Sequence, residues 1–483
     1  MKKYLSRALC LLLCLALVFA LVACDSGKTS SFTLDDDDSW ELDDDTDVSG
    51  DEVSGDAADN TASSDKKGNK NTKKVAETVA NADSLSLEQL VAKMPSSLRG
   101  TTVTVCSWNP VTDVTDADKV VAKFEKQTGI KVKWNQIAYE EYDTKLTGLI
   151  NSKKSPDIIR YIAPAPSRMY LCQDLETATG YDFKGDIWDS RATSSYSYKG
   201  KIYGASLKNT LNQQPTAVFY RPSQINRYKL EDPYTLWKSG KWTYDKFKEI
   251  CRAFKAEVGH AAWMTSAVLD YLWLNDIDLI TFDGTKYKNN LSDPKVINGL
   301  QEIIRNRDDV CPEAAGTGSL LENGTYLFYT DNILATRTTD FHFTELKAKD
   351  DLTCVPFPTQ QGKTYYTNFQ EFEAYGVPKG ASNGPAVYYF LRYYLYRGNY
   401  NENTVFVNKQ CLETYDFLMS QKNYNFNVDR RITDAAGNQN GGIHTMVRTG
   451  EMTVDQVKSK LDSVSPFFDK AVKQANDTLA KFK

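Results

Sequence analysis

The chain has 483 residues, of which 41% are apolar and 12% aromatic, so it can bury two or more sizeable cores. Its formal net charge of −5 excludes the strongly basic balance of a nucleic-acid-binding protein. Only three histidines are present and no HExxH or CxxC spacing occurs, so we expect neither a metal site nor a cofactor.

Residues 1–23 are predicted to be an export signal. Two lysines and Arg7 precede an apolar run over 8–22, which has the length of a signal-peptide core and is shorter than a membrane span. The small residues before Cys24 resemble the lipobox of bacterial lipoproteins, in which this cysteine carries the lipid. We therefore expect Cys24 to anchor the chain at the extracellular face of a bacterial membrane.

Residues 24–82 are predicted to be a disordered tether. Between Asp25 and Asp59, fourteen acidic residues stand against one lysine, and five lysines follow between Lys66 and Lys74. So polar and charge-blocked a segment cannot bury a core, and it extends by self-repulsion. Its length would let it cross a cell wall, which favours a Gram-positive source.

One part of this tether has the spacing of a calcium-binding loop. Asp45, Asp47, Ser49, Gly50 and Asp56 fall at the positions that such a loop uses for its ligands and its sharp turn. The flanks lack a helical pattern, and in so acidic a segment the spacing arises easily. A chance match is therefore the favoured interpretation.

The folded part opens with alternating strands and helices. Ser86 and Gln89 form a capping box for a short helix that ends before Pro95. Beyond it, the alternation of strand and helix patterns predicts an α/β fold, with a parallel sheet and right-handed crossovers. The expected strands cover 102–107, 130–134 and 157–161, and the expected helices carry Val120, Val121 and Phe124, then Tyr142, Leu146, Leu149 and Ile150.

Residues 196–221 have the pattern of a hairpin followed by a crossing segment. Strand-forming residues flank Gly200, which can supply the positive φ of a tight turn. The apolar run 217–220 follows, and Pro215 and Pro222 limit it to a short strand. We expect this stretch to be the waist at which one part of the fold passes to the next.

Three later helices are marked by caps and apolar faces. Thr243 supplies an N-cap, and Thr453 with Gln456 forms a second capping box. The expected helices cover 244–257, 387–396 and 454–464. No pair of cysteines downstream of the tether is close in sequence, so we expect free buried thiols at Cys106, Cys172, Cys251, Cys311, Cys354 and Cys411.

Several segments resemble, in this order, the extracellular solute-binding proteins of ABC importers, in the large sugar-binding family. Trp108 follows the first strand, and the next three are TGIKV at 128–132, SPDII at 155–159 and KGKIYGAS at 199–206. The last is 219–254, a tyrosine-ended strand, a small helix, a turn with proline, then Trp-Thr and a helix. The resemblance covers about residues 100–480.

Two positions depart from that family's pattern. Ser206 stands where proline is usual, and Gly-Thr-Tyr-Leu-Phe at 324–328 stands where the family often has Gly-x-x-Ala-Met.

The resemblance implies a two-lobed, periplasmic-binding-protein-like fold with hinge crossovers. Such a protein would capture a carbohydrate, expected to be an oligosaccharide, in an interlobe cleft, close around it and deliver it to an ABC permease without catalysis. We expect a monomer. The implied first lobe covers 100–214 with about 330–372, and the second covers 215–329 with about 373–483, against which helix 387–396 would pack.

A sugar site needs flat aromatic rings and planar hydrogen-bonding groups, and in α/β lobes it lies beyond the carboxyl ends of the strands. For each aromatic residue the alternative is that it fills a core. By the strand-end rule, together with the place where the family's chain crosses back between lobes, the candidate ligand-binding residues are Trp108, Asn109, Tyr161, Tyr220, Arg221, Trp263, Tyr271, Trp273, Tyr329, Asp331, Phe369 and Glu371.

Two alternative functions stay open at the level of sequence. Glu371 and Glu373 are two residues apart on a predicted strand, and they could act as the carboxylate pair of a glycan hydrolase. The second alternative is a solute-binding protein for another ligand, such as a peptide, a polyamine or a metal complex.

Overall fold

A computed structural model describes residues 78–108, 117–161, 163–208, 213–265, 269–307, 319–338, 340, 342–360, 362–395 and 405–482. The signal peptide, Cys24, the calcium-loop spacing, Asn109 and Cys311 lie outside the described residues. The described cysteines Cys106, Cys172, Cys251, Cys354 and Cys411 are free and buried, as predicted.

A four-stranded sheet forms the centre of the first lobe. Its strands lie in the order β13-β3-β1-β2, and both β2 and β3 are parallel to β1. The predicted strand–helix–strand–helix–strand pattern is therefore confirmed. The bounds are β1 Thr102–Ser107, α3 Ala117–Thr128, β2 Lys131–Gln136, α4 Tyr142–Asn151, β3 Ile158–Tyr161 and β13 Ala374–Gly376.

Helix α2 (Leu87–Ala92) confirms the predicted capping box, since Ser86 and Gln89 bond to each other's backbone amides. Helix α15 (Gly384–Tyr394) is buried along its whole length. It packs on α3 and on α6 (Leu175–Thr179) of the first lobe, not on the second lobe as expected. The helix has no solvent-facing side, so its pattern alone could not show which lobe it joins.

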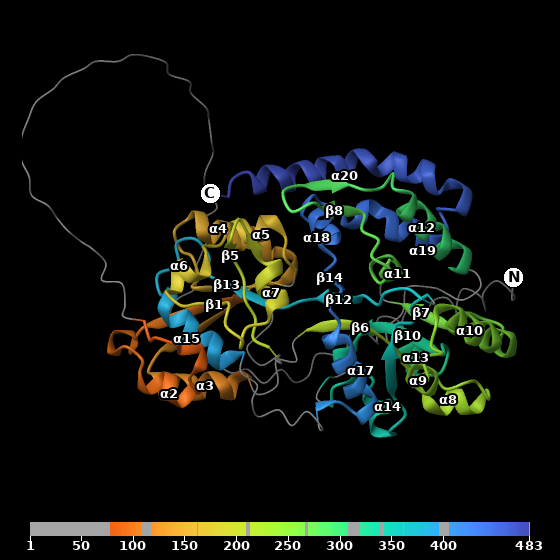
Figure 1. Cartoon of the computed structure of the whole chain (residues 1–483), viewed down its shortest axis with the longest axis horizontal. Helices are drawn as coiled ribbons and strands as arrows, with labels where there is room; N and C mark the ends of the chain where they lie inside the picture. The colour runs from red at the N-terminus through yellow and green to blue at the C-terminus, as the bar shows by residue number, and fades with distance from the viewer. Residues whose placement is uncertain are drawn as a thin grey trace, which may run out of the picture. The chain divides into compact units, whose positions relative to one another are not determined.

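The second lobe is built on a larger mixed sheet. Its strands lie in the order β14-β12-β6-β10-β7, and β11 also pairs with β6. Strand β6 runs through the middle of this sheet (Figure 1). The bounds are β6 Gln214–Tyr220, β7 Trp263–Thr265, β10 Phe328–Asn332, β11 Thr353–Pro356, β12 Thr367–Glu371 and β14 Tyr424–Asn425.

The crossing back from the second sheet to the first differs from the boundaries expected from sequence. Strands β10, β11 and β12 pair within the second sheet, whereas β13 pairs with β3 in the first. The chain therefore changes sheet just after Glu371, while the sequence-based division put 330–372 with the first lobe. Both β12 and β13 are short, with five and three residues, so local pattern does not say which sheet either strand joins.

The predicted waist is confirmed as a hairpin and a crossing strand. Strands β4 (Ser197–Tyr198) and β5 (Lys201–Ile202) pair antiparallel around Lys199 and Gly200, which both have positive φ. Strand β6 begins at Gln214 and includes Pro215, although proline was expected to limit the strand. Pro215 is tolerated because it lies at the end of β6, where the register with β12 is irregular.

The closing helix is longer than the sequence indicated. Its capping box at Thr453 and Gln456 is present, but α20 spans Val457–Leu479 and continues through Pro466. Proline in a helix interior removes one backbone hydrogen bond. Five buried residues beyond it offset that loss by packing: Phe468, Ala471, Val472, Ala475 and Leu479.

Helix α20 runs beside β9 (Tyr287–Asn289), which pairs with β8 (Ile280–Phe282), and beside α12 (Pro294–Arg307) (Figure 1). Phe482, just beyond its end, packs on the first lobe, with ring centroids 5.0 Å from Tyr203 and 5.3 Å from Tyr198. The remaining helices are α5 Pro166–Tyr170, α7 Ser190–Ser195, α8 Pro222–Arg227, α9 Pro233–Lys238, α10 Tyr244–Val258, α11 Asp270–Trp273, α13 Ser319–Glu322, α14 Thr344–Ala348, α17 Lys409–Ser420, α18 Val428–Ala435 and α19 Ile443–Thr449.

Within the described ranges, no helix has both the length and the apolar character that crossing a membrane requires.

Candidate ligand-binding site

On the first lobe, aromatic and cationic side chains gather at the carboxyl ends of β1, β2 and β3. The half-buried ring of Trp108 meets Tyr139 and Tyr142 edge to face, with centroids 5.7 and 5.1 Å away. The guanidinium carbon of Arg160 lies 4.5 Å from the centroid of the Trp108 ring. Trp108 was predicted for this place by the strand-end rule, and its ring is held from three sides.

Arg160 is fixed from behind by a buried ion pair. Its Nη2 donates to Glu373 Oε2 at 2.9 Å, and the side chains of Arg160 and Glu373 are 7% and 4% exposed. The Tyr375 hydroxyl also donates to the Glu373 carboxylate. Arg160 lies on β3, Tyr375 lies on β13 and Glu373 directly precedes β13, so the paired strands set the orientation of the guanidinium next to Trp108.

On the second lobe, a polar cluster lies beside the carboxyl ends of β7 and β10. Asp270 is 1% exposed, and Asn368 Nδ2 donates to its Oδ1 at 3.1 Å and to Thr216 Oγ1 at 3.2 Å. Asp270 Oδ2 and Asn368 Oδ1 have no hydrogen-bond partner within the described part of the chain. Buried polar atoms are usually paired, so these two oxygens mark a place where a ligand can bond.

The electrostatics of Asp270 favour its protonated form. Burial first, and then the charge of Asp331, raises the pKa of Asp270 to about 8, while Arg430 and the Asn368 amide act to lower the pKa. At neutral pH the carboxyl group is therefore mostly protonated, and it can donate a hydrogen bond as well as accept one.

A bond between the lobes lies next to this cluster. Arg431 Nη1, on α18 of the second lobe, donates to the hydroxyl of Tyr139 on the first lobe at 2.9 Å. The neighbouring Arg430 interacts electrostatically with both Asp270 and Tyr139, and burial lowers the pKa of its guanidinium. Helix α18 thus connects the polar cluster of one lobe with the aromatic group of the other.

The other predicted residues of the second lobe lie around the cluster or in the core. Asp331 accepts from Tyr329 through Oδ2 at 2.6 Å, and burial raises the pKa of that tyrosine. Trp263 is 7% exposed and donates to Thr330 Oγ1 at 2.6 Å. Trp273 is 1% exposed and donates to Asp429.

Five predicted residues have packing partners away from the cluster. Tyr161 and Tyr220 are buried, and their hydroxyls bond to Cys172 and Asp232. Arg221 pairs with Asp351 at the opposite end of β6 from the crossing. Tyr271 accepts from Gln360, and burial raises its pKa to about 12. Phe369 is fully buried and packs on Phe372 and Phe426.

Of the two carboxylates of the hydrolase alternative, the structure describes only that of Glu373. Glu371 is the last residue of β12 and pairs with Gln214; its side chain lies outside the described atoms. Glu373 is bound in the ion pair with Arg160.

A GxSxG spacing, which is typical of a nucleophile elbow, does occur at 380–384 between β13 and α15. There the amides of Ser382 and Asn383 donate to Asp157 Oδ1 at 3.3 and 3.0 Å. His260 follows α10, His342 precedes α14 and His444 lies on α19, all in the second lobe, whereas a triad needs a histidine beside the serine. We therefore interpret residues 380–384 as the loop that leads into α15, held in place by Asp157.

Sequence reasoning missed Tyr139, Arg160, Asp270, Arg430 and Arg431. Tyr139 follows a strand end, so the strand-end rule could have found it. Arg160 and Asp270 are charges inside apolar runs, which is a signal of a buried polar function. Nothing near Arg430 and Arg431 shows that α18 faces the other lobe.

Comparison with known proteins identifies the family to which the chain is similar. Residues 119–404 match the family described as bacterial extracellular solute-binding protein. A comparison with curated proteins finds no match.

Among solved structures, an ABC substrate-binding protein of Listeria monocytogenes in complex with cycloalternan is 16% identical, with a TM-score of 0.51 over 79% of this chain and 98% of that one. The galacto-N-biose-/lacto-N-biose I-binding protein of Bifidobacterium longum is 14% identical, with a TM-score of 0.57 over 80% and 98%. The GacH receptor of Streptomyces glaucescens is 14% identical, with a TM-score of 0.55 over 77% and 98%. At this identity the likeness shows a shared fold.

Proposed function

This chain belongs to the bacterial extracellular solute-binding proteins, and on that premise we propose that it captures a carbohydrate, an oligosaccharide, between its two lobes. One observation carries the proposal: two neighbouring arginines of α18 reach different lobes. Arg430 interacts with Asp270 of the second lobe, and Arg431 donates to the hydroxyl of Tyr139 on the first. A ligand held there contacts both lobes, so it stabilises the closed arrangement.

The chemistry of the site suits a sugar. Trp108 offers a flat ring for the C–H face of a pyranose, and Asp270, Asn368 and Arg430 offer donors and acceptors for hydroxyl groups. The solved structures of similar fold include complexes with cycloalternan and lacto-N-biose, which supports this ligand class.

The closed form would then be recognised by the permease of an ABC importer, to which the protein delivers its ligand. We propose that lipid on Cys24 holds the protein at the outer face of the membrane while the segment before residue 78 gives it reach; Val79 and Ala82, which the sequence-based division put in the tether, pack on the folded part. We further propose that it acts as a monomer and does not alter its ligand chemically. Globomycin treatment of producing cells tests the anchor, because blocked signal cleavage leaves a heavier precursor.

A panel of glycans tests the ligand class. Maltodextrins, xylo-oligosaccharides and lacto-N-biose are added to the purified protein, and melting temperature and tryptophan emission are recorded. At least one glycan should raise the melting temperature and change the emission.

The variant Arg430→Gln should lose that response, and Arg227→Gln on α8 is the matched control that should keep it. A panel with no response at millimolar concentration contradicts the proposal. Release of reducing ends from a glycan would favour a hydrolase instead.

A further inference from the structure

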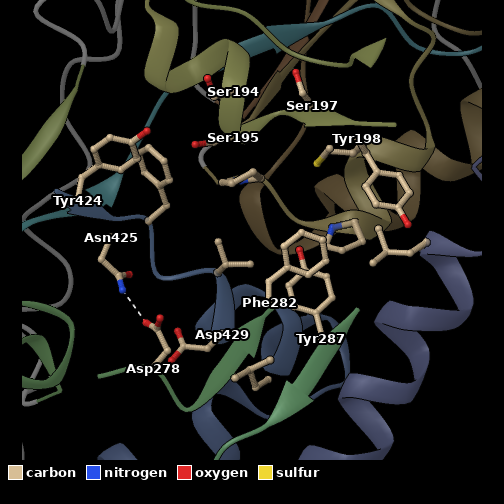
Figure 2. Close-up of a pocket in the computed structure, with 17 residues that line it drawn as sticks. Ser194, Ser195, Ser197, Tyr198, Asp278, Phe282, Tyr287, Tyr424, Asn425 and Asp429 are labelled. Atoms are coloured by element: carbon tan, nitrogen blue, oxygen red, sulfur yellow. Dashed lines mark hydrogen bonds between the residues drawn. The ribbon is translucent and has the colours of Figure 1, made fainter. Parts of the chain in front are cut away.

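A cavity lies between the lobes, and its lining does not include Trp108, Asp270 or Asn368. It has a volume of about 340 Å³, which is within the range of small-molecule pockets. The first lobe contributes Ser195 and Tyr198 to its wall, and the second lobe contributes Asp278, Tyr287, Tyr424 and Asp429 (Figure 2).

Strand β12 separates this cavity from the candidate site. Successive side chains of a strand point to opposite faces. Asn368 bonds to Asp270 on one face, whereas Phe369 packs on Phe426 with ring centroids 5.6 Å apart, and Phe426 lines the cavity. A ligand of the cavity therefore does not touch Asp270.

Two carboxylates lie side by side in the cavity wall (Figure 2). Asp429 is 2% exposed and its oxygens already accept from Trp273 Nε1 at 3.0 Å and from the amides of Leu279 and Arg430 at 3.1 and 2.6 Å. Asp278 is less buried, and Asn425 Nδ2 donates to its Oδ1 at 2.6 Å. Asp278 is therefore the carboxylate with room for a further donor.

The charged residues that line the cavity are all acidic. Among the described residues that line it, none is lysine, arginine or histidine. Burial, and then repulsion from Asp429, raises the pKa of Asp278 well above its ordinary value, as expected for an acid without a cationic partner.

Aromatic rings complete the wall. The rings of Phe282 and Tyr287 lie 4.6 Å apart, and Tyr198 faces them from the first lobe (Figure 2). Aromatic faces attract cations, and they also pack against apolar groups. The described residues contain no group of three side chains that could hold a metal ion. The cavity therefore favours an organic cation over a metal ion.

We propose that this cavity binds a small organic cation, a primary amine whose ammonium group pairs with Asp278 and whose apolar part lies against Tyr198, Phe282 and Tyr287. The ammonium supplies the positive charge that the wall lacks, and the cavity is large enough for one aromatic amine. Since both lobes line the cavity, the amine binds best to the arrangement of lobes described here.

Phenethylamine is a suitable probe, and 2-phenylethanol is its neutral counterpart of the same shape. In calorimetric titrations of the whole chain, phenethylamine should bind with a submillimolar Kd and 2-phenylethanol should not bind. Asp278→Asn should weaken phenethylamine binding about tenfold or more, since a charge-assisted bond is lost. Asp462→Asn, an exposed aspartate on α20, should leave the binding unchanged.

A second variant tests whether the amine binds in this cavity. Ser195→Phe, on the opposite wall, fills the cavity without removing a carboxylate, and it should abolish binding. Equal affinity for the amine and the alcohol, unchanged binding in Asp278→Asn or in Ser195→Phe, or no heat from the wild type would each overturn the proposal. The glycan panel measures glycan binding separately on the wild type, and Asp270 and Asn368 of the candidate site lie on the other face of β12, so a failure of amine binding leaves the proposed function standing.

Discussion

Arg431 and Tyr139 form a hydrogen bond of 2.9 Å that joins α18 of the second lobe to the 3-10 turn Tyr139–Glu141 that follows β2 of the first. Tyr139 is one of the exposed large aromatic residues, at 41%, and its ring lies against Trp108. The bond brings together two side chains that are 292 positions apart. It therefore depends on the arrangement of the lobes, and its loss should affect closure more than folding.

Tyr139→Phe removes the hydroxyl of this bond and keeps the ring beside Trp108. We expect glycan affinity to fall about fivefold, since a hydrogen bond of this kind contributes about 1 kcal/mol. The melting temperature of the ligand-free protein should change little. Calorimetric titration with a glycan that binds the wild type measures the effect, and Tyr228→Phe at the end of α8 serves as control. Unchanged glycan affinity would show that the Arg431–Tyr139 hydrogen bond does not contribute to ligand binding.

Asp270 should make stability depend on pH. Its folded pKa of about 8 is raised above the unfolded value, so folding favours the protonated form, and stability falls as pH rises toward 8. Between pH 6 and 8 the loss from this group is about 2 kcal/mol. Asp270→Asn should abolish that part of the slope. Urea unfolding of both proteins at pH 6 and pH 8 measures it, and parallel slopes would show that Asp270 is ionised in the fold.

Glu373→Gln should destabilise the first lobe, because it leaves the buried guanidinium of Arg160 without its counter-charge. Removing one partner of a buried ion pair costs about 3 to 5 kcal/mol. Urea unfolding checks this, with the exposed Glu345→Gln on α14 as control. If Glu373→Gln were as stable as the wild type and lost a glycan-cleaving activity instead, the hydrolase alternative would gain support.

Phe482→Ala should loosen the contact between α20 and the first lobe. The ring packs on Tyr170, Tyr198 and Tyr203, and Lys199 Nζ donates to the Phe482 carbonyl at 2.8 Å. Truncating a buried phenylalanine costs about 3 kcal/mol or more, so the melting temperature should fall clearly. Phe282→Ala is the control, since Phe282 is 44% exposed and should cost much less. Equal melting temperatures for the two variants would mean that the Phe482 contact does not stabilise the fold.

Local pattern predicted the local parts of this structure. The strand Thr102–Ser107, the helix capped by Thr243 and the hairpin at Lys199-Gly200 depend on neighbouring residues, and each was found as expected. The sheet partners of β12 and β13 depend on contacts far along the chain, and no local signal decides them.

Local sequence pattern was also insufficient to identify the residues of the candidate site. The strand-end rule selected Trp108, which is half-buried after the end of β1, but it also selected Tyr161 and Tyr220, whose side chains are buried in the core. Aromatic residues serve cores and ligand sites equally well, so their type alone could not separate the two roles. Asp270 and Arg430 come together only because α11 and α18 pack near the crossing strands.

The central claim is that a carbohydrate binds between the lobes, and calorimetric titration of the wild type and of Trp108→Ala with the glycan panel tests it most directly. We predict that at least one oligosaccharide binds the wild type with a micromolar Kd and binds Trp108→Ala at least tenfold more weakly, because the ring is the flat surface on which the sugar stacks. Absence of binding to every glycan at millimolar concentration, or equal affinity in the two proteins, would contradict the account.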